Sequence, residues 1–85
     1  MQSFTYVIKD ELGIHARPAG LLVKEAKKYA STVTLECGDK KAAAKGLMGV
    51  MGMAIKQGNE VKVTVEGEDE AVAAAELKAF FESTL

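Results

Sequence analysis

The sequence predicts an α+β fold, an antiparallel sheet with helices on one side and water on the other, in the element order βαββαβα. Segments in which apolar and polar residues alternate, as in strands, are separated by segments with the periodicity of helices. The alternating segments are apolar on one face only, which is typical of an antiparallel sheet covered on one side. The 85 residues are expected to form a single domain over 1–85, large enough for one core.

The first strand and the first helix follow one another along the chain. Residues 4–8 alternate, with Phe4, Tyr6 and Ile8 on one face, and this predicts a strand. Residues 9–13 form a loop, and over residues 16–30 the apolar positions recur at the ~100° spacing of a helix. The residues expected on its buried side are Ala19, Leu22, Val23, Ala26, Tyr29 and Ala30.

The middle of the chain predicts a hairpin and a short helix. Two strands, over 32–37 and 40–44, flank Gly38 and Asp39, a two-residue hairpin turn. Residues 46–55 are apolar and rich in methionine, which is typical of a short helix that its glycines weaken. The residues of this segment expected to fill the core are Val50, Met53 or Ile55.

The last strand and the last helix complete the order. The alternation over residues 60–67 predicts a strand with Val61, Val63 and Val65 facing inward. Asp69 is expected to cap the N-terminus of the final helix. The expected inner face of that helix consists of Ala73, Ala74, Leu77, Phe80 and Phe81.

Composition excludes several function classes. A net charge of −1 gives no reason to expect binding to nucleic acid or insertion into a membrane. The single cysteine, Cys37, cannot form an internal disulfide, and the start of the chain does not read as a signal peptide, so we expect a cytoplasmic protein. One histidine and one cysteine, far apart in sequence, do not make a metal site, and no serine or cysteine lies in a hydrolase motif. We therefore expect neither a metal nor a cofactor.

The stretch LGIHARPAG holds the only histidine, His15, and the only proline, Pro18, with Arg17 between them. Proline suits the first turn of a helix, so His15 is expected at the helix N-terminus, next to the free N–H groups of Ala16 and Arg17. The positive helix end favours neutral imidazole, and the guanidinium of Arg17 fits phosphate oxygens. These groups together could accept a phosphoryl group, although a lone histidine here also fits a solvated or capping residue.

The side of this helix opposite the core is expected to carry a basic stripe with one apolar residue. By the same ~100° spacing its members are Arg17, Gly20, Leu21, Lys24 and Lys28. Such a stripe is either a solvated face or a surface on which acidic partners dock. Leu21, Lys24 and Lys28 are therefore candidate partner-binding residues.

Three segments, GIHARPAG, KGLMGVMGMAIKQG and VEGEDEAVAAAELKAFF, resemble the HPr family, the histidine-containing phosphocarriers of the bacterial phosphoenolpyruvate-dependent sugar phosphotransferase system. The resemblance covers nearly the whole chain and implies an open-faced β-sandwich, a four-stranded antiparallel sheet with three helices on one face. It implies that His15 takes a phosphoryl group on Nδ1 from phosphorylated enzyme I and passes it to enzyme IIA domains of sugar transporters, while Arg17 balances the phosphate charge. It further implies a cytoplasmic, monomeric carrier that is not itself an enzyme, with an exposed contact patch of Leu47, Met48 and Met51.

Two positions depart from the family pattern. Leu12 stands where members often carry Ser or Asn, so the helix amides and Arg17 must hold the phosphate without a polar side chain from that position. Gly46 stands where many Gram-positive members have a regulatory serine, so that hydroxyl is absent. A regulatory binding module of the same fold remains the alternative to a phosphocarrier, although such a module would not need the intact motif around His15.

Overall fold

A computed structural model describes residues 1–14 and 16–85 of the chain. The strands are β1 (Gln2–Val7), β2 (Thr32–Cys37), β3 (Lys40–Ala43) and β4 (Glu60–Glu66), and the helices are α1 (Ala16–Ala26), α2 (Leu47–Gly52) and α3 (Glu70–Thr84). This order is the βαββαβα order that the sequence predicts.

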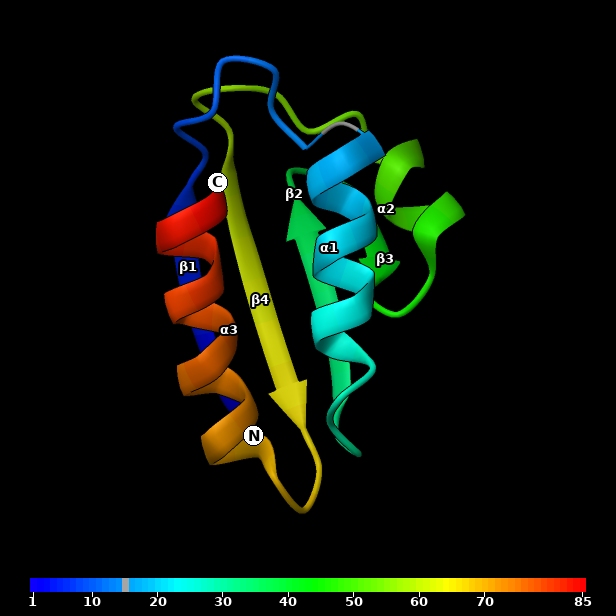
Figure 1. Cartoon of the computed structure of the whole chain (residues 1–85), viewed down its shortest axis with the longest axis vertical. Helices are drawn as coiled ribbons and strands as arrows, with labels where there is room; N and C mark the ends of the chain where they lie inside the picture. The colour runs from blue at the N-terminus through cyan, green and yellow to red at the C-terminus, as the bar shows by residue number, and fades with distance from the viewer. Residues whose placement is uncertain (15) are drawn as a thin grey trace.

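The four strands form one sheet in the order β1-β4-β2-β3, and every neighbouring pair is antiparallel. Cys37 pairs with Lys40, which leaves Gly38 and Asp39 as the predicted two-residue turn, with Gly38 at a φ of 62°. All three helices lie on the same face of the sheet, with α1 between α2 and α3 (Figure 1). The open-faced β-sandwich predicted from the sequence is therefore confirmed.

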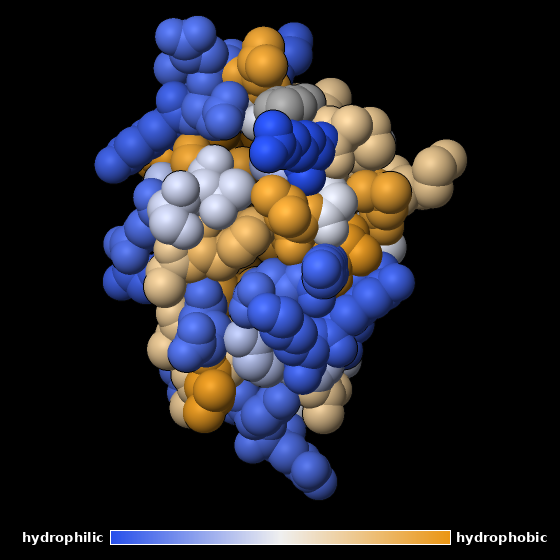
Figure 2. Space-filling view, in the orientation of Figure 1, coloured by the Kyte–Doolittle hydropathy of each residue, from blue (hydrophilic) through white to orange (hydrophobic). Residues whose placement is uncertain are grey.

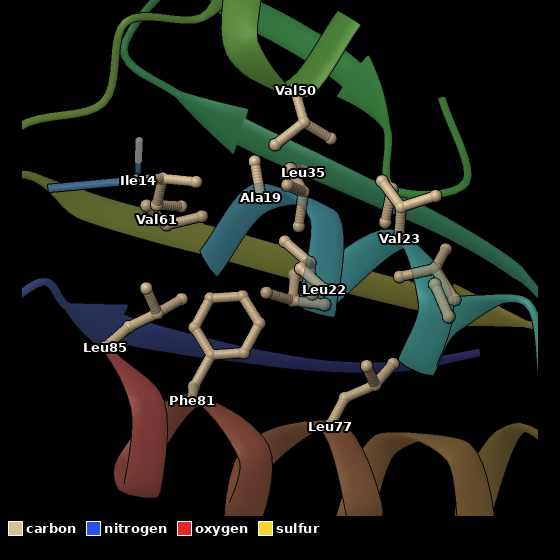
Figure 3. Packing of buried hydrophobic residues seen from close by; sticks show 14 of the residues in the cluster. Ile14, Ala19, Leu22, Val23, Leu35, Val50, Val61, Leu77, Phe81 and Leu85 are labelled. Carbon is tan, nitrogen blue, oxygen red and sulfur yellow. The ribbon is translucent and has the colours of Figure 1, made fainter. Parts of the chain in front are cut away.

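The core lies between this face of the sheet and the helices. Val61, Val63 and Val65 of the central strand β4 are fully buried, as predicted. Phe81 of α3 packs edge-on against Phe4 and Tyr6 of β1, with ring centroids 5.7 Å apart in both pairs. Figure 3 shows the side chains of Phe81, Leu77 and Leu22 converging from α3 and α1. The three core candidates of the methionine-rich segment, Val50, Met53 and Ile55, are all buried.

Helix α1 ends at Ala26, four residues before the end predicted from the periodicity. The N–H groups of Lys28 and Tyr29 donate to carbonyls only three residues back, those of Glu25 and Ala26, so the chain tightens and leaves the helix. The ammonium group of Lys45 donates to the carbonyl of Tyr29 (2.8 Å), which holds the end of this turn. The expectation that Tyr29 and Ala30 lie on the helix is therefore wrong.

Asp69 stands at the N-cap position of α3, but its carboxylate makes no capping hydrogen bond. It accepts hydrogen bonds instead from the N–H groups of Ala30 and Ser31, both at 3.0 Å, and from the Ser31 hydroxyl. These bonds, the one from the Ser31 hydroxyl above all, hold the pKa of the Asp69 carboxyl below its usual range. The predicted local cap is thus a tertiary contact that joins α3 to the segment between α1 and β2.

Candidate functional site

The segment that leads to α1 is fixed against the residues that follow α2. Gly13 has a φ of 67°, and a Cβ atom at this position would lie only 2.2 Å from the carbonyl oxygen of Ile55. The N–H of Ile14 donates to the same oxygen at 3.1 Å. Position 13 therefore requires glycine. His15, the expected phosphoryl acceptor, lies outside the described residues.

Helix α1 begins at Ala16, with Ala16 and Arg17 exposed and Pro18 buried in the first turn. The first N–H groups of a helix have no acceptor within the helix, and they carry its positive end. An exposed guanidinium at such an end is suited to an anion with several oxygens, such as a phosphate. The predicted position of Arg17 and of the proline is confirmed.

A patch of exposed apolar side chains lies on α1 and α2. Its members, called the docking patch below, are Leu21, Leu47, Met48 and Met51, with exposed fractions between 42% and 86%. In Figure 2 hydrophobic side chains gather over α2 and the adjoining upper part of α1, while hydrophilic ones cover the lower part of α1. Val50 points from the same short helix into the core, so α2 buries one side and exposes the others.

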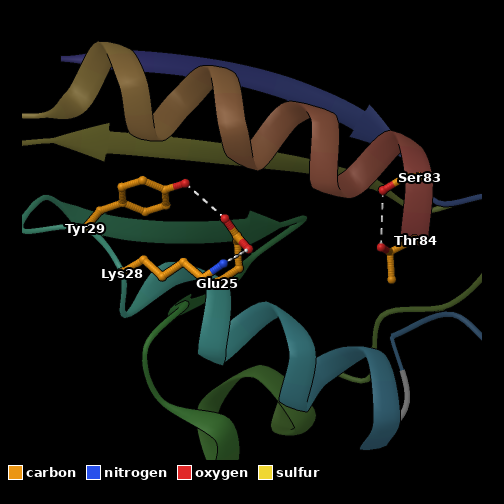
Figure 4. A network of polar contacts seen from close by, with 5 residues as sticks. All are labelled: Glu25, Lys28, Tyr29, Ser83 and Thr84. Carbon is orange, nitrogen blue, oxygen red and sulfur yellow. Dashed lines mark hydrogen bonds and ion pairs between the residues drawn. The ribbon is translucent and has the colours of Figure 1, made fainter.

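The basic stripe is shorter than the sequence predicts. Lys24 is exposed in the last turn of α1, but Lys28 lies beyond the helix and pairs with Glu25, with the Lys28 ammonium 3.1 Å from its carboxylate. The Tyr29 hydroxyl donates to the other oxygen of Glu25 at 2.9 Å (Figure 4). Burial, and next the hydrogen bond to Glu25 and its charge, raise the pKa of Tyr29 to about 12. Lys28 is therefore not on the helical stripe, and its charge is partly neutralised by Glu25.

A hollow of about 370 Å³ lies beside Arg17, on the side of α1 that faces α3. It is lined by Asp10, Arg17, Pro18, Leu21, Ser83 and Thr84. The main-chain oxygen of Leu85 accepts hydrogen bonds from the N–H groups of Lys9 (2.7 Å) and Asp10 (2.9 Å), which fixes the loop against the end of α3. The sequence gives no signal for this hollow, because it joins the loop at Asp10 and the start of α1 to the end of α3, which lies at the other end of the chain.

The other features that the sequence singles out are the thiol of Cys37, the absence of a metal-ligand cluster, and Gly46. Cys37 is a free thiol at the end of β2, partly exposed. Within residues 1–14 and 16–85, no three acidic, histidine or cysteine side chains are grouped closely enough to hold a metal ion. None of the helices in this described part has the length and apolar character needed to cross a membrane. Gly46 is the N-cap of α2, and a Cβ there would lie 3.6 Å from the carbonyl oxygen of Ala43, an ordinary contact.

Comparisons with known proteins agree on one family. The family model for the PTS HPr component phosphorylation site matches residues 2–83. The phosphocarrier protein HPr of Mycoplasma capricolum is 44% identical over 69 residues, which cover 81% of this chain and 78% of the relative. Among solved structures, a mycoplasma histidine-containing phosphocarrier protein superposes with a TM-score of 0.95 at 38% identity, covering 98% of this chain and 94% of that chain. An HPr dimer from Thermoanaerobacter tengcongensis superposes with a TM-score of 0.77 at 43% identity, covering 98% of this chain and 95% of that one. By these matches the chain belongs to the HPr family of bacterial phosphocarrier proteins.

Proposed function

We propose that the chain carries a phosphoryl group on His15, taking it from phosphorylated enzyme I and passing it to enzyme IIA domains of sugar transporters. The observation that carries this proposal is the exposed side chain of Arg17 in the first turn of α1, two residues after His15 and close to Leu21 of the docking patch, with which it lines one hollow. A fixed cation and a surface for a partner protein are the two things that a phosphoryl carrier needs next to its acceptor.

The transfer is an exchange of one bond to phosphorus for another. A lone pair of neutral His15, on Nδ1, forms the new nitrogen–phosphorus bond as the bond to the donor breaks, and the donor keeps the electron pair of that bond. Charge builds up on the three equatorial oxygens of the phosphoryl group, where the fork of Arg17 and the first N–H groups of α1, those of Ala16 and Arg17, stabilise it. The same step then runs again with an acceptor histidine of the next protein, so the chain is a substrate at each step and not a catalyst.

The docking patch supports recognition of more than one protein. Methionine side chains adapt to differently shaped surfaces, and Met48 is the most exposed of the patch. Lys24 adds positive charge that attracts acidic partners, whereas Lys28 is paired with Glu25 and adds less. We expect the carrier to act in the cytoplasm as a single domain. The HPr dimer of Thermoanaerobacter tengcongensis makes the oligomeric state a point to measure, and we expect a monomer here.

The test is phosphorylation in vitro. The chain is incubated with phosphoenolpyruvate and enzyme I, and its intact mass is measured before and after treatment with acid and with base. We expect one phosphoryl group, lost in acid and kept in base, and none on His15→Ala. Arg17→Ala should fold normally, because the side chain is exposed, but transfer more slowly. Phosphate that survives acid, or a wild-type chain that gains no mass, would contradict the proposal, and the latter would favour a regulatory binding module.

A further inference from the structure

Asp10 is held in a fixed position at the hollow beside Arg17. Its N–H donates to the main-chain oxygen of Leu85 (2.9 Å), and its carbonyl accepts the N–H of Gly13 (3.0 Å). One oxygen of its carboxylate accepts the N–H of Leu12 (2.9 Å). Main chain and side chain are thus both anchored, and the negative charge of Asp10 stays at one place next to the hollow.

The described residues that line the hollow include one charge of each sign. Asp10 supplies the negative charge and Arg17 the positive one, and the other four lining residues are uncharged. Within residues 1–14 and 16–85, neither of these two charges belongs to an ion pair. Because Arg17 is exposed and its side chain is long, the guanidinium can turn toward the carboxylate or toward the start of α1. Opposite charges on one hollow attract each other, and salt weakens the attraction.

A phosphoryl group on the chain draws on the same guanidinium. Under the proposed function this group lies at the start of α1, where Arg17 and the first N–H groups stabilise its oxygens. Leu12, whose side chain is 71% exposed and apolar, brings no polar group to that place, so more of the charge balance falls on Arg17. A fixed anion that attracts Arg17 therefore competes with the phosphate for it.

We propose that Asp10 is a positioning residue for Arg17, which draws the guanidinium over the hollow in the free chain and competes with the phosphoryl group for it in the phosphorylated chain. The inference rests on the proposed function, because it takes the phosphoryl group to be carried at the start of α1. The competition makes the phosphorylated chain less stable relative to the free one. The phosphoryl group is then passed on more readily, as a carrier that has to release it requires.

The experiment compares two substitutions that each remove one negative charge. In Asp10→Asn the amide oxygen still accepts the N–H of Leu12, so the turn is kept and only the charge is lost. Glu11→Gln is the matched control, since Glu11 is the next residue, is exposed and does not line the hollow. Each substitution is made in the wild-type chain and in Arg17→Ala, and Tm is measured as a check on folding.

The quantity measured is the equilibrium constant for phosphorylation. The chain is mixed with phosphoenolpyruvate, an excess of pyruvate and a catalytic amount of enzyme I. Phosphoenolpyruvate gives its phosphoryl group to the chain, takes up a proton and becomes pyruvate, and the phosphorylated fraction is read from the intact mass once it is constant. Because enzyme I acts here only as a catalyst, its affinity for the chain does not enter the result. In the unphosphorylated chain, the Nε–H signal of Arg17 in ¹H–¹⁵N spectra reports whether the guanidinium senses Asp10.

We expect Asp10→Asn to raise the equilibrium constant by about twofold to fivefold at low salt, and by less as salt is added. Glu11→Gln should change it much less. In the Arg17→Ala background the effect of Asp10→Asn should shrink toward that of Glu11→Gln. Asp10→Asn, unlike Glu11→Gln, should also move the Nε–H signal of Arg17.

Equal constants for the two variants in the wild-type background overturn the inference. So does an Asp10→Asn effect of the same size in Arg17→Ala, because Asp10 would then act on the phosphate directly. If the wild-type chain is phosphorylated and either of these results is found, only this inference fails. If no phosphoryl group is ever gained, the proposed function fails, and the Nε–H signal decides alone: a response to Asp10→Asn only supports the positioning of Arg17 by Asp10, and an unmoved signal overturns it.

Discussion

Replacing Gly13 by alanine tests how the loop before α1 is held in place. Gly13 and Gly38 have nearly the same φ, 67° and 62°, but they differ in their surroundings. A Cβ on Gly13 would meet the carbonyl oxygen of Ile55 at 2.2 Å, whereas nothing lies within 4 Å of a Cβ on Gly38. Gly38→Ala is therefore a control that shares the backbone conformation and lacks the close contact.

The magnitude follows from two contributions. Alanine in the left-handed region costs about 1–2 kcal/mol at either position, offset in part by a less disordered unfolded chain. At position 13 the contact adds to this, because carbon–oxygen approaches run at about 3.3–3.6 Å and the two segments must separate by roughly 1 Å. That movement breaks the hydrogen bond from Ile14 to Ile55, now 3.1 Å, at a cost of about 1–3 kcal/mol if the buried groups stay unpaired.

We therefore expect Gly13→Ala to lose about 2–4 kcal/mol of unfolding free energy and Gly38→Ala about 1 kcal/mol. For a domain of this size the Tm values should fall by roughly 8–30 °C for Gly13→Ala and roughly 4–8 °C for Gly38→Ala. Urea and thermal unfolding, followed by circular dichroism, measure both variants under one set of conditions. If the two variants lose equal stability, Gly13 and Ile55 do not approach each other as described, and the reasoning fails.

Three further substitutions probe other features. Ala54 is exposed and has a φ of 52°, in the left-handed region that glycine tolerates better. Ala54→Gly should therefore raise the urea midpoint and add about 0.5–1 kcal/mol to the unfolding free energy, after the larger entropy of unfolded glycine is deducted. A lower midpoint would exclude strain at this residue. Asp69 has a lowered pKa in the folded state, so its contribution to stability is complete above the pKa of the unfolded chain and is lost as pH falls through the folded value. Asp69→Asn should therefore unfold more easily at neutral pH and lose less on acidification, and equal slopes of free energy against pH in both proteins would contradict this. Gly46→Ser should have an unfolding free energy within a few tenths of a kcal/mol of the wild type. Only this variant should accept phosphate from an HPr kinase with ATP, because residues 41–56 of the wild type contain no hydroxyl group. Phosphate found on the wild-type chain would refute the prediction.

The strands and most helical faces could be predicted because each depends on a local period. The alternation of Val61, Val63 and Val65 places them in the core whatever their neighbours are. The end of α1 could not be predicted in this way. Tyr29 continues the helical period, but its carbonyl accepts a hydrogen bond from Lys45, sixteen residues later, and the chain leaves the helix before it. Asp69 is likewise predicted as a helix cap, because the sequence pattern does not show that its hydrogen-bond donors, Ala30 and Ser31, lie nearly forty residues away.

In the candidate site, too, the features with a local sequence signal could be predicted, and those that depend on distant contacts could not. The positions of Arg17 and Pro18 follow from the motif at the start of α1, and the exposure of Leu47, Met48 and Met51 was implied by the family resemblance; the structure places these side chains as expected. The hollow and the exposure of Leu12 depend on how the loop at residues 9–14 meets the end of α3, which the sequence pattern does not encode. The role of His15 stays a prediction for the phosphorylation experiment.

The brevity of α2 has a consequence for how the molecule opens in solution. The helix has six residues, two of them glycine, and only Val50 anchors it in the core. Strand β4, by contrast, is bonded on both sides and buries three valines. Amide hydrogens of α2 should therefore exchange with solvent through a local opening, while those of β4 exchange only when the whole domain unfolds. Three of the four residues of the docking patch lie on α2, the helix that opens most easily. Under the proposed function, this surface can therefore adjust to proteins of different shape while the sheet behind it stays fixed.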